Sequence, residues 1–146
     1  NADIYINVQG DEPLVDPADI NKVLKEKVNN PKSIVNGFCW ISPEENPESV
    51  NIPKVITTED DQLVYMSRKA LPGFKDNKNA PIKYKKQVCI YGFSKEELDD
   101  FIIEILRFLE LGYKIKMVET KPGSLAVDIP EDVSVVENAL RKVNML

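Results

Sequence analysis

The feature that most constrains the fold is a short apolar run that ends in a polar turn near the start of the sequence. Residues 4–8 are mostly apolar, and Gln9–Pro13 follow with two adjacent carboxylates. Such a run is typical of a strand covered on both faces, as in a parallel sheet. Ligands of open α/β sheets bind beyond the carboxyl ends of strands, so Asp11 is placed to hold a metal ion and a polyphosphate. The alternative is a turn that only begins the next helix.

The rest of the chain alternates between helix patterns and strand patterns. Asp16 and Pro17 favour a helix start, and Ser94 with Glu97 has the spacing of a capping box. Gly112 suits the end of that second helix, which we expect to contain a break. The alternation predicts an α/β sheet with antiparallel additions. Helices are expected over residues 17–29, 95–111 and from 130 onward, strands over 4–8, 34–41, 54–57, 63–67, 87–93 and 113–119, and a loop over 72–81.

Composition favours one globular domain. The 146 residues, 42% of them hydrophobic, suffice for one core. No apolar run approaches the roughly 20 residues of a membrane span, and the first residues do not form a signal peptide, so we expect a cytoplasmic protein without a membrane partner. The chain begins almost directly in a strand, without a leading Met. We therefore expect it to be part of a larger fold.

The content of titratable residues excludes several kinds of chemistry. The sequence has no histidine, which removes Ser-His-Asp and Cys-His catalysis. Cys39 and Cys89 lie in apolar strand patterns, which favours buried thiols over a disulfide or a zinc site. The net charge of -5 argues against a nucleic-acid partner. Carboxylates, a metal ion and positioned charges remain as chemical tools.

Two turns have the same form. Asp11 and Asp128 each end an extended segment, and each precedes a proline and a helix. If the sheet brings the turns together, the two carboxylates could share one Mg²⁺, an ion that prefers hard oxygen ligands together with phosphates and water. The alternative is that each aspartate only caps its helix.

Four further side chains are candidates for substrate contacts. Arg68 ends an apolar run and could bind a carboxylate or phosphate, or form an ordinary surface salt bridge. Gln87 and Tyr91 share one face of a strand, so their polar ends could point into a cleft, although Tyr91 could equally be a core residue. Glu104 lies among apolar residues and is either the polar side of a helix or a carboxylate directed at a sugar hydroxyl.

Five segments of the chain together carry a family resemblance. They are Asn7–Pro13, Val64–Arg68 with Leu71–Pro72, Ile90–Phe93, Leu106–Glu110 with Gly112, and Val127–Asp132. In order and spacing the chain resembles the cytidylyltransferases that activate acidic sugars, most closely the CMP-Kdo synthetases (3-deoxy-manno-octulosonate cytidylyltransferases). The resemblance covers nearly the whole chain, and five segments in the same order are hard to obtain by chance.

The resemblance implies a Rossmann-like nucleotide-diphospho-sugar transferase (GT-A-like) fold with a mixed sheet, here incomplete. It implies that CTP and 3-deoxy-manno-octulosonate (Kdo) give CMP-Kdo and diphosphate, for lipopolysaccharide or capsule synthesis, in a homodimer. By position, Asp11 and Asp128 match the catalytic Mg²⁺ ligands, and Gln9 with Asp11 matches the nucleotide contacts. The positions that match contacts to the sugar acid are Arg68, Gln87, Tyr91 and Glu104.

The chain departs from the family pattern in three ways. The opening half-domain with the phosphate-binding loop is absent, so residues 1–146 read as a single domain that is the C-terminal portion of a catalytic domain, and we expect them to be inactive alone. Gln87 stands where the family commonly has histidine, and Ile105 where it has glutamine, which makes a changed sugar credible. The segment between Phe101 and Glu104 is shorter than its family counterpart.

Two alternatives therefore stay open. One is a cytidylyltransferase for another ulosonic acid, of the 8-amino-Kdo or sialic-acid type. The other is a non-catalytic dimerising module. In either case we expect residues 43–87 to form an extended arm and hairpin that serves as the dimerisation region.

Overall fold

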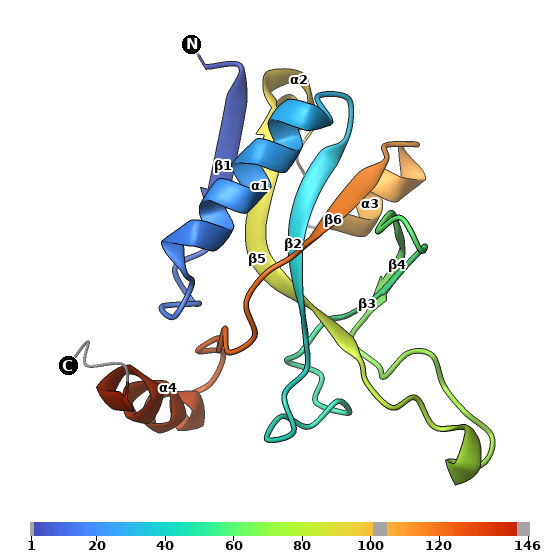
Figure 1. Cartoon of the computed structure of the whole chain (residues 1–146), viewed down its shortest axis with the longest axis vertical. Coiled ribbons are helices and arrows are strands. Elements are labelled where there is room, and N and C mark those ends of the chain that lie inside the picture. Colours follow the sequence, from blue (N-terminus) through green and yellow to red (C-terminus); the bar gives the residue numbers. More distant parts are fainter. Residues whose placement is uncertain (1, 101–104, 143–146) are drawn as a thin grey trace.

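A six-stranded mixed sheet forms the centre of the fold in the computed structural model, which describes residues 2–100 and 105–142 (Figure 1). Four α-helices and one 3₁₀ turn accompany it in the described part of the chain. The strands are β1 (Ile4–Val8), β2 (Ile34–Trp40), β3 (Lys54–Thr57), β4 (Leu63–Ser67), β5 (Lys85–Ser94) and β6 (Ile115–Glu119). The helices are α1 (Pro17–Asn29), α2 (Lys95–Asp99), α3 (Ile105–Glu110), α4 (Pro130–Lys142) and the 3₁₀ turn η1 (Asn77–Asn79).

Strand β5 organises the sheet because it pairs with three other strands. Its C-terminal half pairs antiparallel with β1 and its first residues with β3, while β2 runs antiparallel along its other side. Strand β2 also pairs in parallel with β6, and β3 pairs antiparallel with β4. The predicted mixed sheet and the predicted 54–67 hairpin are both confirmed.

The prediction for the first strand is wrong in one respect. Residues 4–8 form a strand, but β1 runs antiparallel to β5 and is only partly buried, with Val8 exposed. The strand lies at an edge, and β5 is its one strand partner among the described residues. An apolar run shows that a strand is at least partly covered, but it carries no information about the direction of its neighbour.

Local signals for helix ends are confirmed by the structure. The Asp16 side chain accepts the N–H of Ala18, and Ser94 with Glu97 forms the complete capping box of α2. Gly112 follows α3 with φ of +85°, as a glycine beyond a helix end does. The expected long helix is divided: α2 ends at residue 99 and α3 begins at residue 105.

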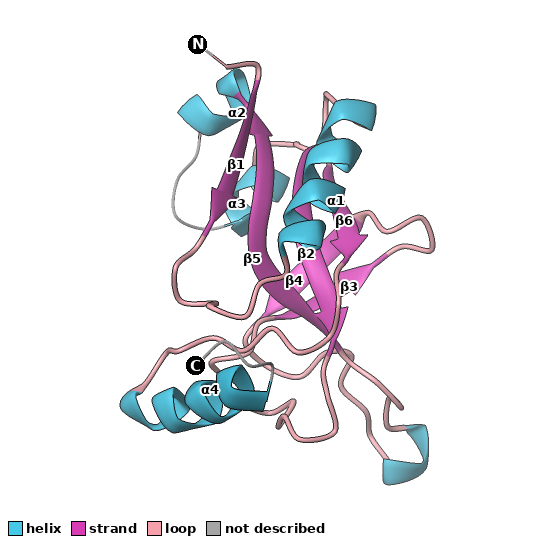
Figure 2. Cartoon of the chain, turned by 60° about the vertical axis from the view of Figure 1, so that its left-hand side comes forward, coloured by secondary structure: helices cyan, strands magenta, loops and turns pink. Residues whose placement is uncertain are grey.

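The two faces of the sheet have separate apolar clusters. On one face α1 packs Val23 against Val88 and Ile90 of β5, and on the other α3 packs Phe108 near Phe93. Figure 2 shows α1 in front of the sheet and α3 behind it. The alternation along β5 follows from the strand period, which turns successive side chains to opposite faces.

A buried ion pair joins α1 to α2. The Nζ of Lys27 donates to the Glu97 carboxylate at 2.6 Å, and the two side chains are only 1% and 5% exposed. The same ammonium donates to the carbonyl oxygens of Ser33 at 2.8 Å and Pro31 at 3.0 Å. All three protons of the ammonium therefore have acceptors, which is the condition for burying a lysine.

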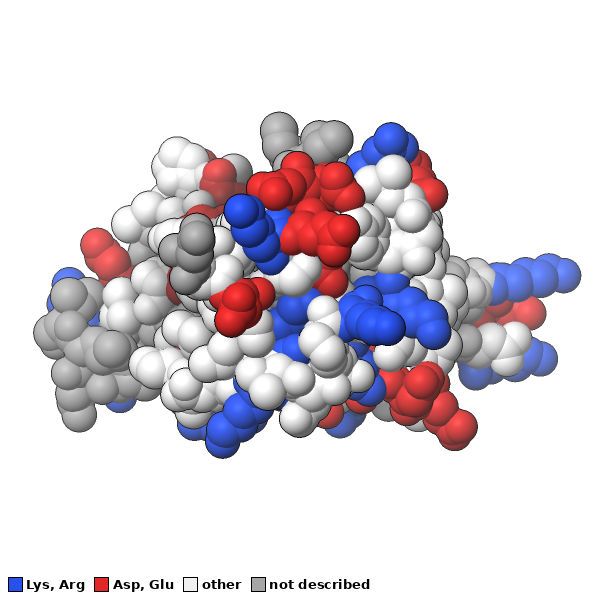
Figure 3. Space-filling view, turned by 90° about the horizontal axis from the view of Figure 1, so that it is seen from above, with Lys and Arg blue, Asp and Glu red and all other residues white. Residues whose placement is uncertain are grey.

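The surface has mixed charge and one extended arm. On the face shown in Figure 3, acidic and basic side chains are interspersed. The segment between β4 and β5 leaves the sheet as the predicted loop and contains only the short turn η1. Among the described helices, none is both long enough and apolar enough for a membrane span.

Candidate active site

A cavity of about 630 Å³ lies beside β5 and collects side chains from distant parts of the sequence. Cavities of about 300–1,000 Å³ are typical of small-ligand sites. The turn after β1, the connection before β3, β4, β5 and the segment leading into α4 all contribute to its wall. Among its lining residues are six of the predicted site residues: Gln9, Asp11, Arg68, Gln87, Tyr91 and Asp128. The remaining one, Glu104, lies outside the described residues.

Two carboxylates in this cavity influence each other. Burial, followed by the negative charge of Asp11, raises the pKa of Asp128, while the positive charge of Arg68 opposes the shift. The Oδ1 atom of Asp11 is buried and has no hydrogen-bond partner in the described part of the chain. The turn and the Asp128 segment are also joined directly, because the N–H of Val127 donates to the carbonyl oxygen of Asp11 at 2.8 Å.

This donor set fits a magnesium ion. A bound cation would supply the partner that the Asp11 oxygen lacks and would offset the repulsion between the two carboxylates. No group of three His, Cys, Asp or Glu side chains suited to a metal exists within the described ranges. That suits Mg²⁺, which is commonly held by one or two carboxylates together with substrate phosphates and water.

The capping alternative does not account for either aspartate. Asp16, not Asp11, supplies the side-chain cap of α1. At the start of α4, the carboxylate of Asp132 accepts the N–H groups of Asp128 and Ile129, each at 3.0 Å. The backbone of Asp128 is therefore fixed by another residue, which leaves its own carboxylate available to the cavity.

Gln87 and Tyr91 lie in the cavity in a defined orientation. The Nε2 of Gln87 donates to the Tyr91 hydroxyl at 3.0 Å and to Oδ1 of Asn36 at 2.9 Å. The Asn36 amide cannot be reversed, because its Nδ2 donates to the carbonyl oxygens of Val88 and Ile90. Both N–H groups of the Gln87 side chain therefore have acceptors. Its carbonyl oxygen is the atom left to accept a hydrogen bond from a ligand.

Arg68 lies at the end of β4 with part of its guanidinium engaged. Its Nη1 donates to the carbonyl oxygens of Val50 and Asn51, at 3.1 and 3.3 Å. The buried ammonium of Lys54 donates to the Arg68 carbonyl oxygen at 2.7 Å, which fixes the backbone there. Arg68 forms no ion pair with any residue that the structure describes. Within the described part of the chain the surface salt bridge expected as an alternative is therefore not formed, and the Nε and Nη2 atoms of the guanidinium remain for an anion.

Sequence reasoning missed a largely buried polar network in the wall of this cavity. Glu12 accepts the N–H of Cys89 at 2.9 Å and the hydroxyl proton of Ser124. Lys86 donates to the carbonyl oxygen of Ser124 at 2.6 Å and forms an ion pair with Glu45. One signal was available in the sequence. Lys86, Val88 and Ile90 are two residues apart along β5, so the side chain of Lys86 lies on the same buried face of the strand as the other two.

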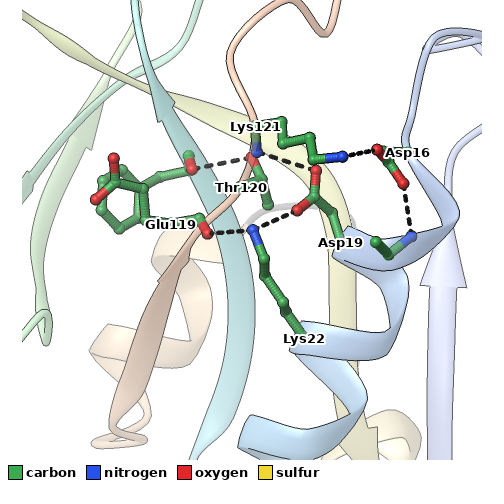
Figure 4. A network of polar contacts seen from close by, with 8 residues as sticks. Asp16, Asp19, Lys22, Glu119, Thr120 and Lys121 are labelled. Carbon is green, nitrogen blue, oxygen red and sulfur yellow. Dashed lines mark hydrogen bonds and ion pairs between the residues drawn. The ribbon is translucent and has the colours of Figure 1, made fainter.

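A second group of charged residues fastens the chain that leaves β6 to the start of α1 (Figure 4). The backbone N–H of Lys121 donates to Asp19 at 3.0 Å, and its ammonium donates to Asp16. This contact raises the pKa of Lys121 and lowers the pKa of Asp16. Lys22 pairs with Asp19 at 2.7 Å, and Thr120 bonds to β2. The chain is thereby directed from β6 toward the cavity.

Comparison with known proteins shows the family of the chain. The family model described as cytidylyltransferase matches residues 1–120. The 3-deoxy-manno-octulosonate cytidylyltransferase of Christiangramia forsetii is 36% identical over 148 residues, which cover 91% of this chain and 59% of that protein. The protein of the same name from Solibacter usitatus is 35% identical and matches 97% of this chain and 61% of its own length. The chain thus spans about three fifths of these relatives.

Solved structures show the same relationship. The structure of CMP:2-keto-3-deoxy-manno-octonic acid synthetase complexed with CTP superimposes with a TM-score of 0.80 at 25% identity and covers 97% of this chain and 63% of that one. The inositol-1-phosphate CTP transferase from T. maritima, with a TM-score of 0.64 at 16% identity and coverage of 98% and 57%, shares the fold. From its fold and from the family match over residues 1–120, the chain belongs to the cytidylyltransferase family.

Proposed function

We propose that the protein activates a keto-deoxy sugar acid: CTP and 3-deoxy-manno-octulosonate give the CMP-sugar and diphosphate. The observation that carries this proposal is the meeting of Asp11 and Asp128 in one cavity with Arg68, Gln87 and Tyr91. The names of the relatives support the same reaction. Because the chain spans about three fifths of those relatives, the proposed activity is to be tested on the full-length gene product.

In the proposed reaction the anomeric hydroxyl of the sugar acid attacks the α-phosphorus of CTP, and diphosphate leaves. Asp11 and Asp128 would hold Mg²⁺, which when bound neutralises charge developing on the phosphates. Gln9 lines the same cavity and is proposed to contact the nucleotide. Arg68 would bind the sugar carboxylate through its remaining N–H groups. Positioning and electrostatics supply the catalysis, so no histidine is required.

The identity of the sugar is proposed to depend on Gln87. Its carbonyl oxygen can accept a hydrogen bond from a sugar hydroxyl or from an amino group. This acceptor favours Kdo or a related ulosonic acid that carries a donor at the facing carbon, including 8-amino-Kdo. Glu104 remains a proposed sugar contact.

We also propose that two copies pair through the arm between β4 and β5. The arm and the adjoining strand expose large apolar side chains, an uncommon arrangement for a surface that stays in water. Ile82 is 97% exposed, and the others are Val64, Tyr65 and Phe74. As a consumer of CTP, the enzyme would work in the cytoplasm and supply the activated sugar for lipopolysaccharide or capsule synthesis.

The test measures diphosphate release by the full-length gene product with CTP and Mg²⁺. The acceptors are Kdo, 8-amino-Kdo and sialic acid, each supplied at equal concentration, and a reaction without acceptor is the control. We expect acceptor-dependent release with at least one keto-deoxy acid and formation of its CMP derivative. No turnover of any acceptor would contradict the proposal, and the absence of CTP binding as well would favour the non-catalytic module.

A further inference from the structure

We propose that Glu12 and Ser124 form a positioning pair that holds the Asp128 segment against Asp11, so that the two carboxylates can share one divalent cation. The inference rests on the proposed function and extends it to residues outside the proposed cation and substrate contacts. Glu12 directly follows Asp11, so one turn supplies both a proposed cation ligand and the side chain that places the second ligand.

The evidence begins with Ser124, which buried charged groups hold from two sides. Glu12 accepts its hydroxyl proton, and Lys86 donates to its carbonyl oxygen at 2.6 Å. The three residues are between 6% and 8% exposed. Burying charged groups is costly unless their hydrogen bonds are satisfied, so this serine is a fixed point rather than part of a loosely attached loop.

Glu12 also fixes this point relative to the sheet. Its other carboxylate oxygen accepts the N–H of Cys89 in β5 at 2.9 Å. Gln9 adds a second attachment, because its N–H donates to the Cys89 carbonyl oxygen at 3.2 Å. The turn, the sheet and the Ser124 segment therefore meet at one carboxylate.

Because Ser124 lies shortly before Asp128 in the sequence, the fixed position of Ser124 also restricts the position of Asp128. Val127 bonds to the backbone of Asp11, and Asp132 holds the N–H of Asp128 at 3.0 Å. One residue advances the chain by at most about 3.6 Å, so a segment anchored at residues 124, 127 and 128 has little freedom. Loss of the first anchor would allow Asp128 to move away from Asp11.

Such movement is favoured when no cation is bound. Asp11 and Asp128 line the same cavity, where two negative charges repel each other. The Glu12–Ser124 contact resists this repulsion before the cation arrives. Residues that surround the ligands of a metal site commonly hold those ligands in position. Mutation of such surrounding residues typically lowers metal affinity or activity by about 10–100-fold.

The test replaces Ser124 by alanine in the full-length gene product and measures Mn²⁺ affinity by electron paramagnetic resonance without nucleotide. Ser134→Ala is the matched control, because Ser134 is an exposed serine of α4 whose hydroxyl donates to the carbonyl oxygen of Glu131. Ser124→Thr is the conservative variant, because it keeps the hydroxyl at a position that lines two cavities. Melting temperatures report folding in all three variants.

We expect Ser124→Ala to weaken Mn²⁺ binding by about 10–100-fold with an unchanged KM for the sugar acid, and to lower the melting temperature because the buried Glu12 carboxylate loses a hydrogen-bond donor. Ser124→Thr should restore most of the affinity. Mn²⁺ affinity of Ser124→Ala within twofold of Ser134→Ala would overturn the inference, whatever the activity. If the parent protein transfers CMP but binds no Mn²⁺, the metal assignment fails and the positioning role with it, while the proposed reaction stands.

Discussion

Replacement of Lys27 by methionine removes the buried cation that joins α1 to α2. Its ammonium donates to Glu97 at 2.6 Å and to the carbonyl oxygens of Ser33 and Pro31. Methionine replaces the aliphatic part of the side chain but leaves the Glu97 carboxylate buried without its cation. Removal of one partner from a buried pair costs about 3–5 kcal/mol, so the free energy of unfolding should fall by that amount, a large part of the total for a small domain.

The measurement is urea unfolding followed by far-UV circular dichroism, with the denaturant dependence compared between variants. Lys25→Met is the control because Lys25 is an exposed lysine of the same helix, and we expect it to change the free energy by at most about 0.5 kcal/mol. A loss below about 1 kcal/mol for Lys27→Met, the range of a solvent-exposed pair, would refute the assignment of a buried pair.

A second substitution separates the charge from the packing. Adding Glu97→Gln to Lys27→Met removes the uncompensated carboxylate, while the amide oxygen can still accept the N–H of Ser94. The double variant should therefore be more stable than Lys27→Met alone. A double variant that is less stable than Lys27→Met would show that the lost free energy came from packing and not from the isolated charge.

Two further predictions concern titratable groups. Because the pKa of Asp128 is raised, protons should compete with Mn²⁺ at a higher pH than for an ordinary aspartate, so affinity should be full above that pKa and fall as the pH drops through it; calorimetry at steps of falling pH measures this, and an affinity that stays constant until the protein unfolds would contradict it. Burial raises the pKa of Cys39 to about 11 and the pKa of Cys89 further, so both thiols should react with iodoacetamide at pH 8 far more slowly in the folded chain than in urea; equal rates would contradict this burial.

The sequence predicted those features whose causes are local. Asp16, the Ser94–Glu97 box and Gly112 determine helix ends through contacts within a few residues, and all are confirmed. The alternation of Gln87 and Tyr91 allowed their polar groups to meet, because the strand period depends only on the backbone; they do meet, and Tyr91 is also part of the core, the alternative that the sequence left open.

Features that depend on distant partners could not be predicted in the same way. The apolar run at residues 4–8 does not show the direction of β5, some 80 residues later. Glu12 gave no indication of its partner Ser124, because the contact joins residues 112 positions apart. The resemblance to a family brought Asp11 and Asp128 together where spacing alone favoured two helix caps over a shared cation.

The most direct test of the account is the stoichiometry of Mn²⁺ binding in the full-length gene product with CTP present. The parent should bind a cation that is lost in Asp11→Asn and equally lost in Asp128→Asn, because one ion needs both carboxylates. Asp76→Asn, a change at an exposed aspartate of the arm, should bind as the parent does. Retention of that cation at parental affinity in either single variant would contradict the claim that these two residues share it.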